Sequence, residues 1–192
     1  MDFGDTIFAS AVALNGRGDS VAAPIRWADL DTIVRIDSLS GTIVARFTGT
    51  GQIQARTGTL RSNPQPITVF LRADTAFADS TPATDSVSIA GKRDSLSDSL
   101  RIRVQTFDTT GAAIGLSGRR VTWSLLYPPD TNSFKFSPVL PITTDLNGLG
   151  VVQIKLHQRT LPDSAVVQAT VTRFNGATVP GMPVTFVVRF YP

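Results

Sequence analysis

The chain has 192 residues, enough for one large domain or two small ones; 42% of them are hydrophobic and 17% are charged. It contains no cysteine, which excludes disulfides, thiolate nucleophiles and cysteine-ligated metals. The formal net charge is +3 at pH 7. Because arginines and aspartates are interleaved along the sequence, we expect no stripe of one sign and no nucleic-acid partner.

The choice of charged and β-branched residues points to one fold class. All fifteen acidic residues are Asp, and only three of the eighteen basic residues are Lys. Glu and Lys are among the best helix formers, whereas the abundant Thr, Val and Ile favour strands. The composition therefore predicts an all-β protein.

Apolar residues recur with a period of two along most of the chain, which is typical of strands. In chain order, residues 6–14 predict one strand, and residues 67–72 predict a closing strand with Ile67, Val69 and Leu71 inward. The same alternation recurs in 100–107, 149–156 and 183–190. Turn signals such as Asn15-Gly16 and Asn147-Gly148 separate these runs. Short strands with turns at this spacing predict a sandwich or barrel.

A change of composition after the first third of the chain suggests a boundary between two domains. Residues 73–86 are rich in Asp, Ser, Thr and Ala, as linkers are. Regular alternation resumes at Val87. We therefore expect a domain over 1–72, a linker over 73–86 and a second domain over 87–192.

The first half resembles a group-2 bacterial immunoglobulin-like domain. The matching segments are Gly4-Asp5-Thr6, Ile25–Trp27, Thr32–Gly58 and the final ITVFL, with family positions at Trp27, Asp37, Gly41, Val44, Ile53 and Ala55. Members of this family usually have a strand before the Gly-Asp-Thr position. Here only Met1 to Phe3 precede it, so we expect the first strand to come from an upstream segment or from a partner.

The second half resembles the invasin/intimin-type group, through RVTWSL (120–125), TTDLNGLGVVQIKL (143–156), AVVQATV (165–171) and the final GMPVTFVVRF. Together the two resemblances imply tandem immunoglobulin-like β-sandwich domains located outside the cytoplasm. They also imply a protein without an active site or cofactor. No apolar run reaches the ~20 residues of a membrane-spanning helix. No signal peptide is visible in MDFGDTIF, so we expect an export signal outside this sequence.

Residues with catalytic or metal-binding potential are few. His157 is the single histidine, on the polar side of a strand, and no nucleophile motif accompanies it. Asp145-Leu146-Asn147-Gly148 begins like a calcium loop but lacks the distal ligands, so it predicts a turn. A calcium ion between the domains, bound by Asp74, Asp79 or Asp85, stays an open alternative. We therefore expect no enzyme, no bound metal and no small-molecule substrate.

Several apolar side chains fall on the polar side of their strands: Phe70, Leu126, Tyr127, Val187 and Tyr191. Such side chains indicate burial against a second surface. That surface is either the neighbouring domain or a protein partner, for which the aromatic residues would be anchors.

The stretch NGRGDS (15–20) contains Arg17-Gly18-Asp19, the tripeptide that integrin ligands display on loops. Asn and two Gly also suit a hairpin turn whose tip is kept solvated by Arg and Asp. The pattern favours the turn, with adhesion as the alternative.

These observations lead to a functional hypothesis with one alternative. The leading reading is a non-catalytic subunit that docks on the extracytoplasmic face of a larger assembly, which could be a membrane complex. The alternative is a spacer or adhesive fragment of a longer bacterial surface adhesin.

Overall fold

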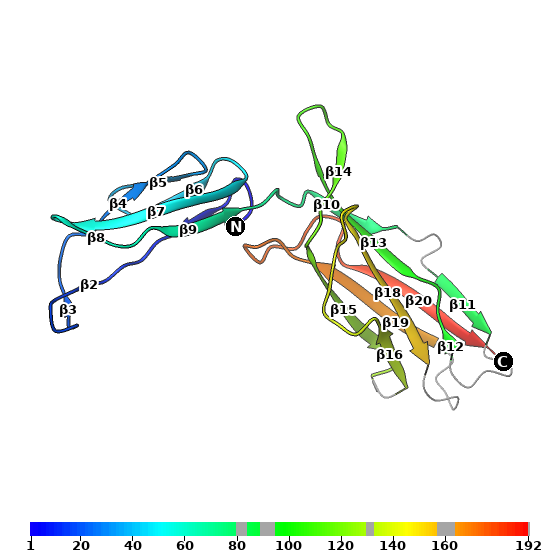
Figure 1. The fold of residues 1–192 in the computed structure, drawn as a ribbon. Coiled ribbons are helices and arrows are strands. Elements are labelled where there is room, and N and C mark those ends of the chain that lie inside the picture. The colour runs from blue at the N-terminus through cyan, green and yellow to red at the C-terminus, as the bar shows by residue number, and fades with distance from the viewer. Residues whose placement is uncertain (80–83, 89–94, 130–132, 157–163, 192) are drawn as a thin grey trace. The chain divides into compact units, whose positions relative to one another are not determined.

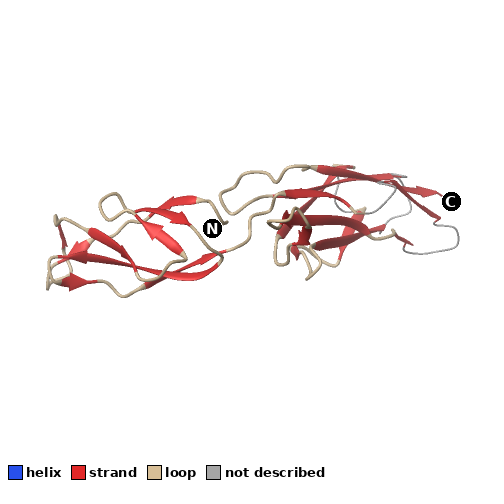
Figure 2. Ribbon diagram, turned by 90° about the horizontal axis from the view of Figure 1, so that it is seen from above, coloured by secondary structure: helices blue, strands red, loops and turns tan. Residues whose placement is uncertain are grey.

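The computed structural model describes residues 1–79, 84–88, 95–129, 133–156 and 164–191. The chain forms two compact units, Met1–Arg72 and Ala73–Pro192 (Figure 1). Figure 2 shows strands and loops only in the described parts of both units. The all-β prediction is confirmed, and each unit is an immunoglobulin-like β-sandwich. No helix in the described residues has the length and hydropathy needed to cross a membrane.

The first unit is built from two main sheets and a small hairpin. One sheet has the order β1-β6-β5, the other has the order β4-β7-β8 with β9 also paired to β7, and β2 pairs with β3. The strands are β1 Thr6–Phe8, β2 Ala13–Leu14, β3 Ser20–Val21, β4 Arg26–Asp29, β5 Val34–Ile36, β6 Thr42–Ala45, β7 Gly49–Thr57, β8 Leu60–Arg61 and β9 Gln65–Val69.

The core of the first unit lies between its two main sheets. Val34 and Ile43 contribute from one sheet, and Ile53 and Val69 from the other, all at most 5% exposed. Trp27 packs against this cluster. A Cβ at Gly41 would lie 2.8 Å from Trp27 Nε1, so a glycine in this turn lets the chain pass directly over the indole.

The second unit is larger and also has two facing sheets. One has the order β10-β13-β18-β12, with β14 on β13 and β16 on β18; the other has the order β11-β20-β19-β15-β17. The strands are β10 Thr75–Ala78, β11 Thr84–Ser88, β12 Ser95–Leu96, β13 Leu100–Phe107, β14 Ala113–Gly115, β15 Arg120–Tyr127, β16 Phe134–Ser137, β17 Ile142–Thr143, β18 Leu149–Leu156, β19 Ser164–Val171 and β20 Val184–Tyr191.

The inward residues of the long strands form the core of the second unit, as their alternation predicts. Ile102 and Ile154 face it from one sheet, and Val167 and Phe186 from the other, with exposed fractions of 0–1%. The ring of Trp123 packs against Phe186, with the ring centroids 5.7 Å apart. Burial on both sides of this interface is what joins the two sheets.

In both units a segment near the start of the unit runs parallel to the last strand or its end; in the second unit this segment is β11, which follows β10. In the second unit β11 pairs with β20 from Thr84↔Val187 to Ser88↔Tyr191. In the first unit Asp2 forms a parallel bridge with Phe70, just after β9. Met1 and Phe3 add backbone hydrogen bonds to residues 68–70, so these N-terminal residues lie beside the end of β9; a first strand from an upstream segment or a partner stays a prediction.

The expected linker over 73–86 is not a linker in the structure. Residues 75–78 form β10, which pairs with β13, and β11 begins at Thr84. Ala73 and Ala76 are fully buried in the second core, and Asp79 forms an ion pair with Arg103 at 2.9 Å. Small buried alanines set among partly exposed Asp and Thr gave this segment its linker-like composition.

Two strand predictions in the first unit are wrong in extent. Residues 6–14 form two separate short strands, and β9 ends at Val69, which leaves Leu71 45% exposed rather than inward. Ala9 N donates to Gly41 O, and the chain then leaves the sheet. Alternation alone did not reveal where backbone pairing stops.

Aspartate carboxylates stabilise several of the tight turns. Asp37 Oδ1 accepts the backbone N–H groups of Leu39 and Ser40, and Asp145 Oδ1 accepts those of Asn147 and Leu149. Asp145-Leu146-Asn147-Gly148 is thus a turn, as predicted. The short side chain of Asp suits such bonds two to four residues ahead.

Two glycines in equivalent turns differ in how closely other backbone atoms approach them, so substituting each one measures what that close approach contributes to stability. Gly148 (φ 77°) and Gly176 (φ 86°) are both left-handed, but a Cβ at Gly148 would clash with the carbonyl oxygen of Val104, whereas Gly176 has open space. We expect Gly176→Ala to lower the free energy of unfolding by about 1–2 kcal/mol through backbone strain. Gly148→Ala should lower it by about 1–3 kcal/mol more, as an overpacked site. Urea unfolding measures both, and equal losses would contradict the close approach.

The acid sensitivity of folding should depend on the Asp108 turn. Hydrogen bonds from the Thr110 hydroxyl and then from the Ala112 and Thr110 N–H groups lower the pKa of Asp108 below its usual value. Its stabilisation is therefore complete above pH ~4 and is lost as pH falls through the lower folded pKa. We expect Asp108→Asn and Thr110→Val to flatten the pH dependence of the urea midpoint below pH ~4. An unchanged slope in both variants would refute this role.

Candidate binding surfaces

The outer face of the β11-β20-β19-β15-β17 sheet carries a row of apolar side chains. Tyr127 is in register with Val166, and Val166 is in register with Val187. Cross-strand partners share a face, so the three side chains lie side by side. The next row on this face is Ser124, Gln168 and Thr185, so the apolar strip is one residue wide.

The structure brings together some of the predicted contact residues but not all. Tyr127 and Val187 belong to the apolar row, and Leu126 adjoins it at an irregularity in the register of β15. Leu126, Tyr127 and Tyr191 are 47–51% exposed, and Val187 is half-buried. Tyr191 is on the same face of β20 but four residues further along, beyond Arg189.

Phe70 belongs to the first unit and is separate from that row. It is 45% exposed, and its backbone pairs with Met1 and Phe3 rather than with a neighbouring long strand. These placements show exposure at Phe70 and the other four residues; contact with a partner stays a proposal.

Arg17-Gly18-Asp19 forms the tip of the β2–β3 hairpin, and all three residues are exposed. Asn15 holds this tip: its Oδ1 accepts the backbone N–H groups of Arg17 and Asp19, at 2.9 and 3.0 Å. Its Nδ2 also donates to Asp19 Oδ2 at 3.1 Å. Gly18 (φ 88°), rather than Gly16, takes the left-handed conformation. The tripeptide is thus presented on an ordered turn.

The carboxylates considered for calcium serve separate partners. Asp79 binds Arg103, Asp74 Oδ2 accepts the Thr106 hydroxyl at 2.8 Å, and Asp85 Oδ2 accepts the N–H of Asp98 at 2.7 Å. Within the described ranges no three His, Cys, Asp or Glu side chains are grouped as metal ligands. His157 lies outside the described residues.

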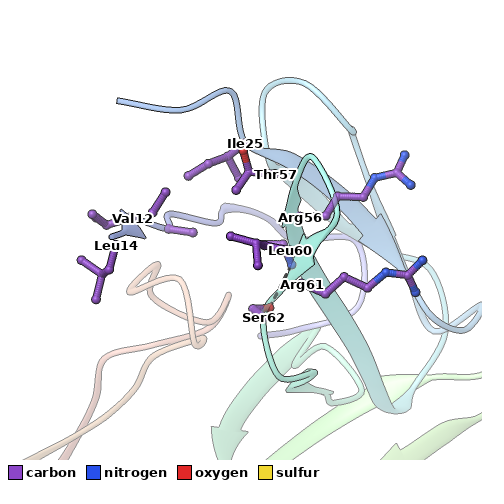
Figure 3. Close-up of a pocket in the computed structure, with 11 residues that line it drawn as sticks. Val12, Leu14, Ile25, Arg56, Thr57, Leu60, Arg61 and Ser62 are labelled. Atoms are coloured by element: carbon purple, nitrogen blue, oxygen red, sulfur yellow. Dashed lines mark hydrogen bonds between the residues drawn. The ribbon is translucent and has the colours of Figure 1, made fainter. Parts of the chain in front are cut away.

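A shallow apolar cleft of about 290 Å³ opens at the end of the first unit, beside the hairpin. Figure 3 shows Val12 and Leu14 on one side of it, facing Leu60 and Ile25 on the other. The side chains of Arg56 and Arg61 extend side by side, away from the cleft. The cleft was not predicted, because residues 11–14 were assigned to a regular strand.

The arginines of the first unit correct the expectation that no stripe of one sign forms. Arg26 in β4 is in register with Arg56 in β7, and Arg56 is in register with Arg61 in β8. Three exposed arginines therefore lie in one row across three strands. Only strand register, which the sequence does not reveal, brings them together.

Comparison with known proteins gives matches at the level of structure only. No family model matches the chain, and no curated protein matches its sequence. Domains 4 and 5 of the surface-layer protein SbsC are 14% identical over 95% of this chain and 80% of theirs, with a TM-score of 0.35. The Yersinia pseudotuberculosis adhesin InvE is 12% identical over all of this chain and 56% of its own, with a TM-score of 0.45. The zebrafish RET cadherin-like domains 1 to 4 are 15% identical over 86% and 40%, with a TM-score of 0.38.

We expect Asn15→Ala to loosen the hairpin tip without unfolding the first unit. The substitution removes the acceptor for the Arg17 and Asp19 N–H groups, so their protection against amide hydrogen exchange should fall about tenfold. Core amides such as Ile43 should keep theirs. Arg17→Ala is the matched control, because no hydrogen bond of its side chain supports the turn. Unchanged exchange at Asp19 would show that Asn15 does not hold the tip.

Proposed function

We propose that this chain is a non-catalytic structural or adhesive module of a bacterial cell-surface protein, acting as a spacer or adhesive segment. The path of the chain through the second unit carries the proposal. In the second unit the chain enters beside Pro180, where Ala76 N donates to Pro180 O, and β20 ends at the opposite end of the sandwich (Figure 1). In the first unit the Asp2–Phe70 bridge is also parallel, but residues 1–3 lie beside residues 68–70.

Entry and exit at opposite ends of the second unit suit a protein that spans distance. A strand of eight residues such as β20 extends about 26 Å at 3.3 Å per residue. The second unit therefore advances the chain by roughly the length of its sandwich. Tension along the chain would load the β11–β20 ladder along the strand direction, so that several backbone hydrogen bonds resist together.

We also propose the finer family assignment and location. The first unit would be a group-2 bacterial immunoglobulin-like domain and the second an invasin/intimin-type domain, both in the extracytoplasmic space after export. Its partners would be other proteins. SbsC is described as a surface-layer protein and InvE as an adhesin, but we base the proposal on the strand pairing of this chain rather than on that likeness.

A second candidate is a subunit docked on the extracytoplasmic face of a larger assembly. The observation that favours it is the apolar row Tyr127, Val166 and Val187, with Leu126 beside it. Aromatic and aliphatic side chains in such a strip serve as interface anchors. Phe70 and Tyr191 are further proposed contacts.

Within the spacer or adhesive function, Arg17-Gly18-Asp19 is a candidate adhesion loop. Its support is the exposed, hydrogen-bonded turn that displays it. Integrin recognition would require a host-associated organism, so immobilised integrin is the direct probe of this loop.

Antibodies against the second unit should label intact source cells, because a surface module is accessible without permeabilisation. On native purification we expect the antigen to travel within a surface polypeptide and not in fixed stoichiometry with a membrane complex. Labelling only after permeabilisation would exclude the surface location. Fixed stoichiometry that Tyr127→Ser abolishes, and the matched Thr122→Ser on the same face retains, would establish the docked subunit instead.

A further inference from the structure

Arg26, Arg56 and Arg61 form the one row of three arginines in register within the first unit, all of whose residues are described. Their Cβ atoms succeed one another at about 5 Å, the spacing of directly opposed residues on neighbouring strands. Figure 3 shows the Arg56 and Arg61 side chains extending in the same direction. Three guanidinium groups therefore share one edge of the β4-β7-β8 face.

Like charges directly opposite each other destabilise a sheet. In the first unit the structure gives none of these three side chains an ion pair with a carboxylate. Asp29, the nearest acidic residue on β4, is in register with the inward Ile53 and so faces the other way. Arg103 shows the contrast, because Asp79 pairs with it. A row that folding leaves uncompensated is suited to an anion from outside.

The face that continues from the row is uncharged and has polar side chains along β7. On β7 the outward residues after Arg56 are Gln54, Gln52 and Thr50, and Thr50 lies opposite Thr68 with their hydroxyl oxygens 3.2 Å apart. Ala28 and Pro66 complete the register on either side. Amide and hydroxyl groups can donate and accept hydrogen bonds with a ligand rich in hydroxyls.

We propose that this face binds an anionic polysaccharide, with Arg26, Arg56 and Arg61 holding successive carboxylate or sulfate groups and the Gln and Thr side chains bonding sugar hydroxyls. Guanidinium groups bind carboxylates and other oxyanions in paired hydrogen bonds. On this face no aromatic residue is in register with the three arginines, so the row lacks a platform of the kind that stacks single-stranded nucleic acid. The exposed apolar residues of the face, Leu30 and Phe70, follow Ala28 on β4 and Thr68 on β9 and are not in register with the row.

This surface is distinct from the apolar row on the second unit and from the hairpin tip. Binding of an anionic polysaccharide goes beyond the proposed structural function. Both a spacer and a docked subunit would carry the same three arginines, so the proposal does not depend on which of the two functions is correct. A failure of the polysaccharide test therefore leaves the surface-labelling result intact, and the reverse also holds.

The test is binding of the full chain to polygalacturonate and to dextran sulfate, at low salt and at about 0.15 M salt, where surface charges are partly screened. Fully methyl-esterified polygalacturonate is the neutral control. We expect binding to the charged polymers, no binding to the neutral one, and weaker binding at higher salt. The triple variant R26Q/R56Q/R61Q should bind on the order of a hundredfold more weakly.

The matched control is R17Q/R35Q/R46Q, which removes the same charge from the same unit but from the hairpin and the opposite sheet. It should lose less than about threefold. Equal losses in both triple variants would reduce the effect to net charge and overturn the site, as would no loss in either. Tighter binding of poly-aspartate or single-stranded DNA than of both polysaccharides would overturn the ligand class.

A stability measurement keeps the test independent of folding defects. Removing the central charge relieves repulsion from both neighbours, so R56Q should raise the melting temperature of the first unit by about 1–3 °C. A variant that melts earlier than wild type would contradict an uncompensated row. Saturating polygalacturonate should also raise the wild-type melting temperature and leave that of R26Q/R56Q/R61Q unchanged.

Discussion

The parallel pairing of an early segment of each unit with its last strand or the end of that strand is the constraint on which the other features depend. It closes one edge of the sandwich, through β11 and β20 in one unit and the Asp2–Phe70 bridge in the other. With this edge closed, the inner residues of both sheets can be buried completely, as Phe186 and Ile43 are. The solvent-facing residues do not contribute to this core, so they can differ between the two units.

Aspartates and arginines have different structural roles in this protein. Carboxylates such as Asp31, Asp37 and Asp145 bind backbone N–H groups in loops, a duty that the shorter Asp performs and that is consistent with the lack of Glu. Several arginines stand instead on strands, where side chains alternate between core and solvent. An interleaved sequence thus yields turns rich in carboxylates and a sheet face rich in guanidinium groups. The net charge of +3 does not reveal that the carboxylates and the guanidinium groups lie on different parts of the fold.

The sequence predicted what depends on local pattern and failed where pairing decides. The period of two identified the faces of β13, β18 and β20 correctly, since burial in a sandwich imposes that period. It could not show that residues 75–78 and 84–86 belong to strands, because small alanines in a core resemble those of a linker. The apolar row through Val166 and the arginine row through Arg56 arise from register. Register follows from loop lengths and irregularities such as that at Leu126, which carry no simple sequence signal.

A closed edge with entry and exit at opposite ends, as in the second unit, has an evolutionary consequence. Duplicating the coding segment of such a unit adds one self-contained sandwich and lengthens the polypeptide, without breaking any strand pair inside the existing copies. Its loss is equally local. Genes for proteins of this kind can therefore change in repeat number by recombination while each copy keeps its fold. Surface residues such as the arginines of β4, β7 and β8 can then diverge in one copy while the others retain their original roles.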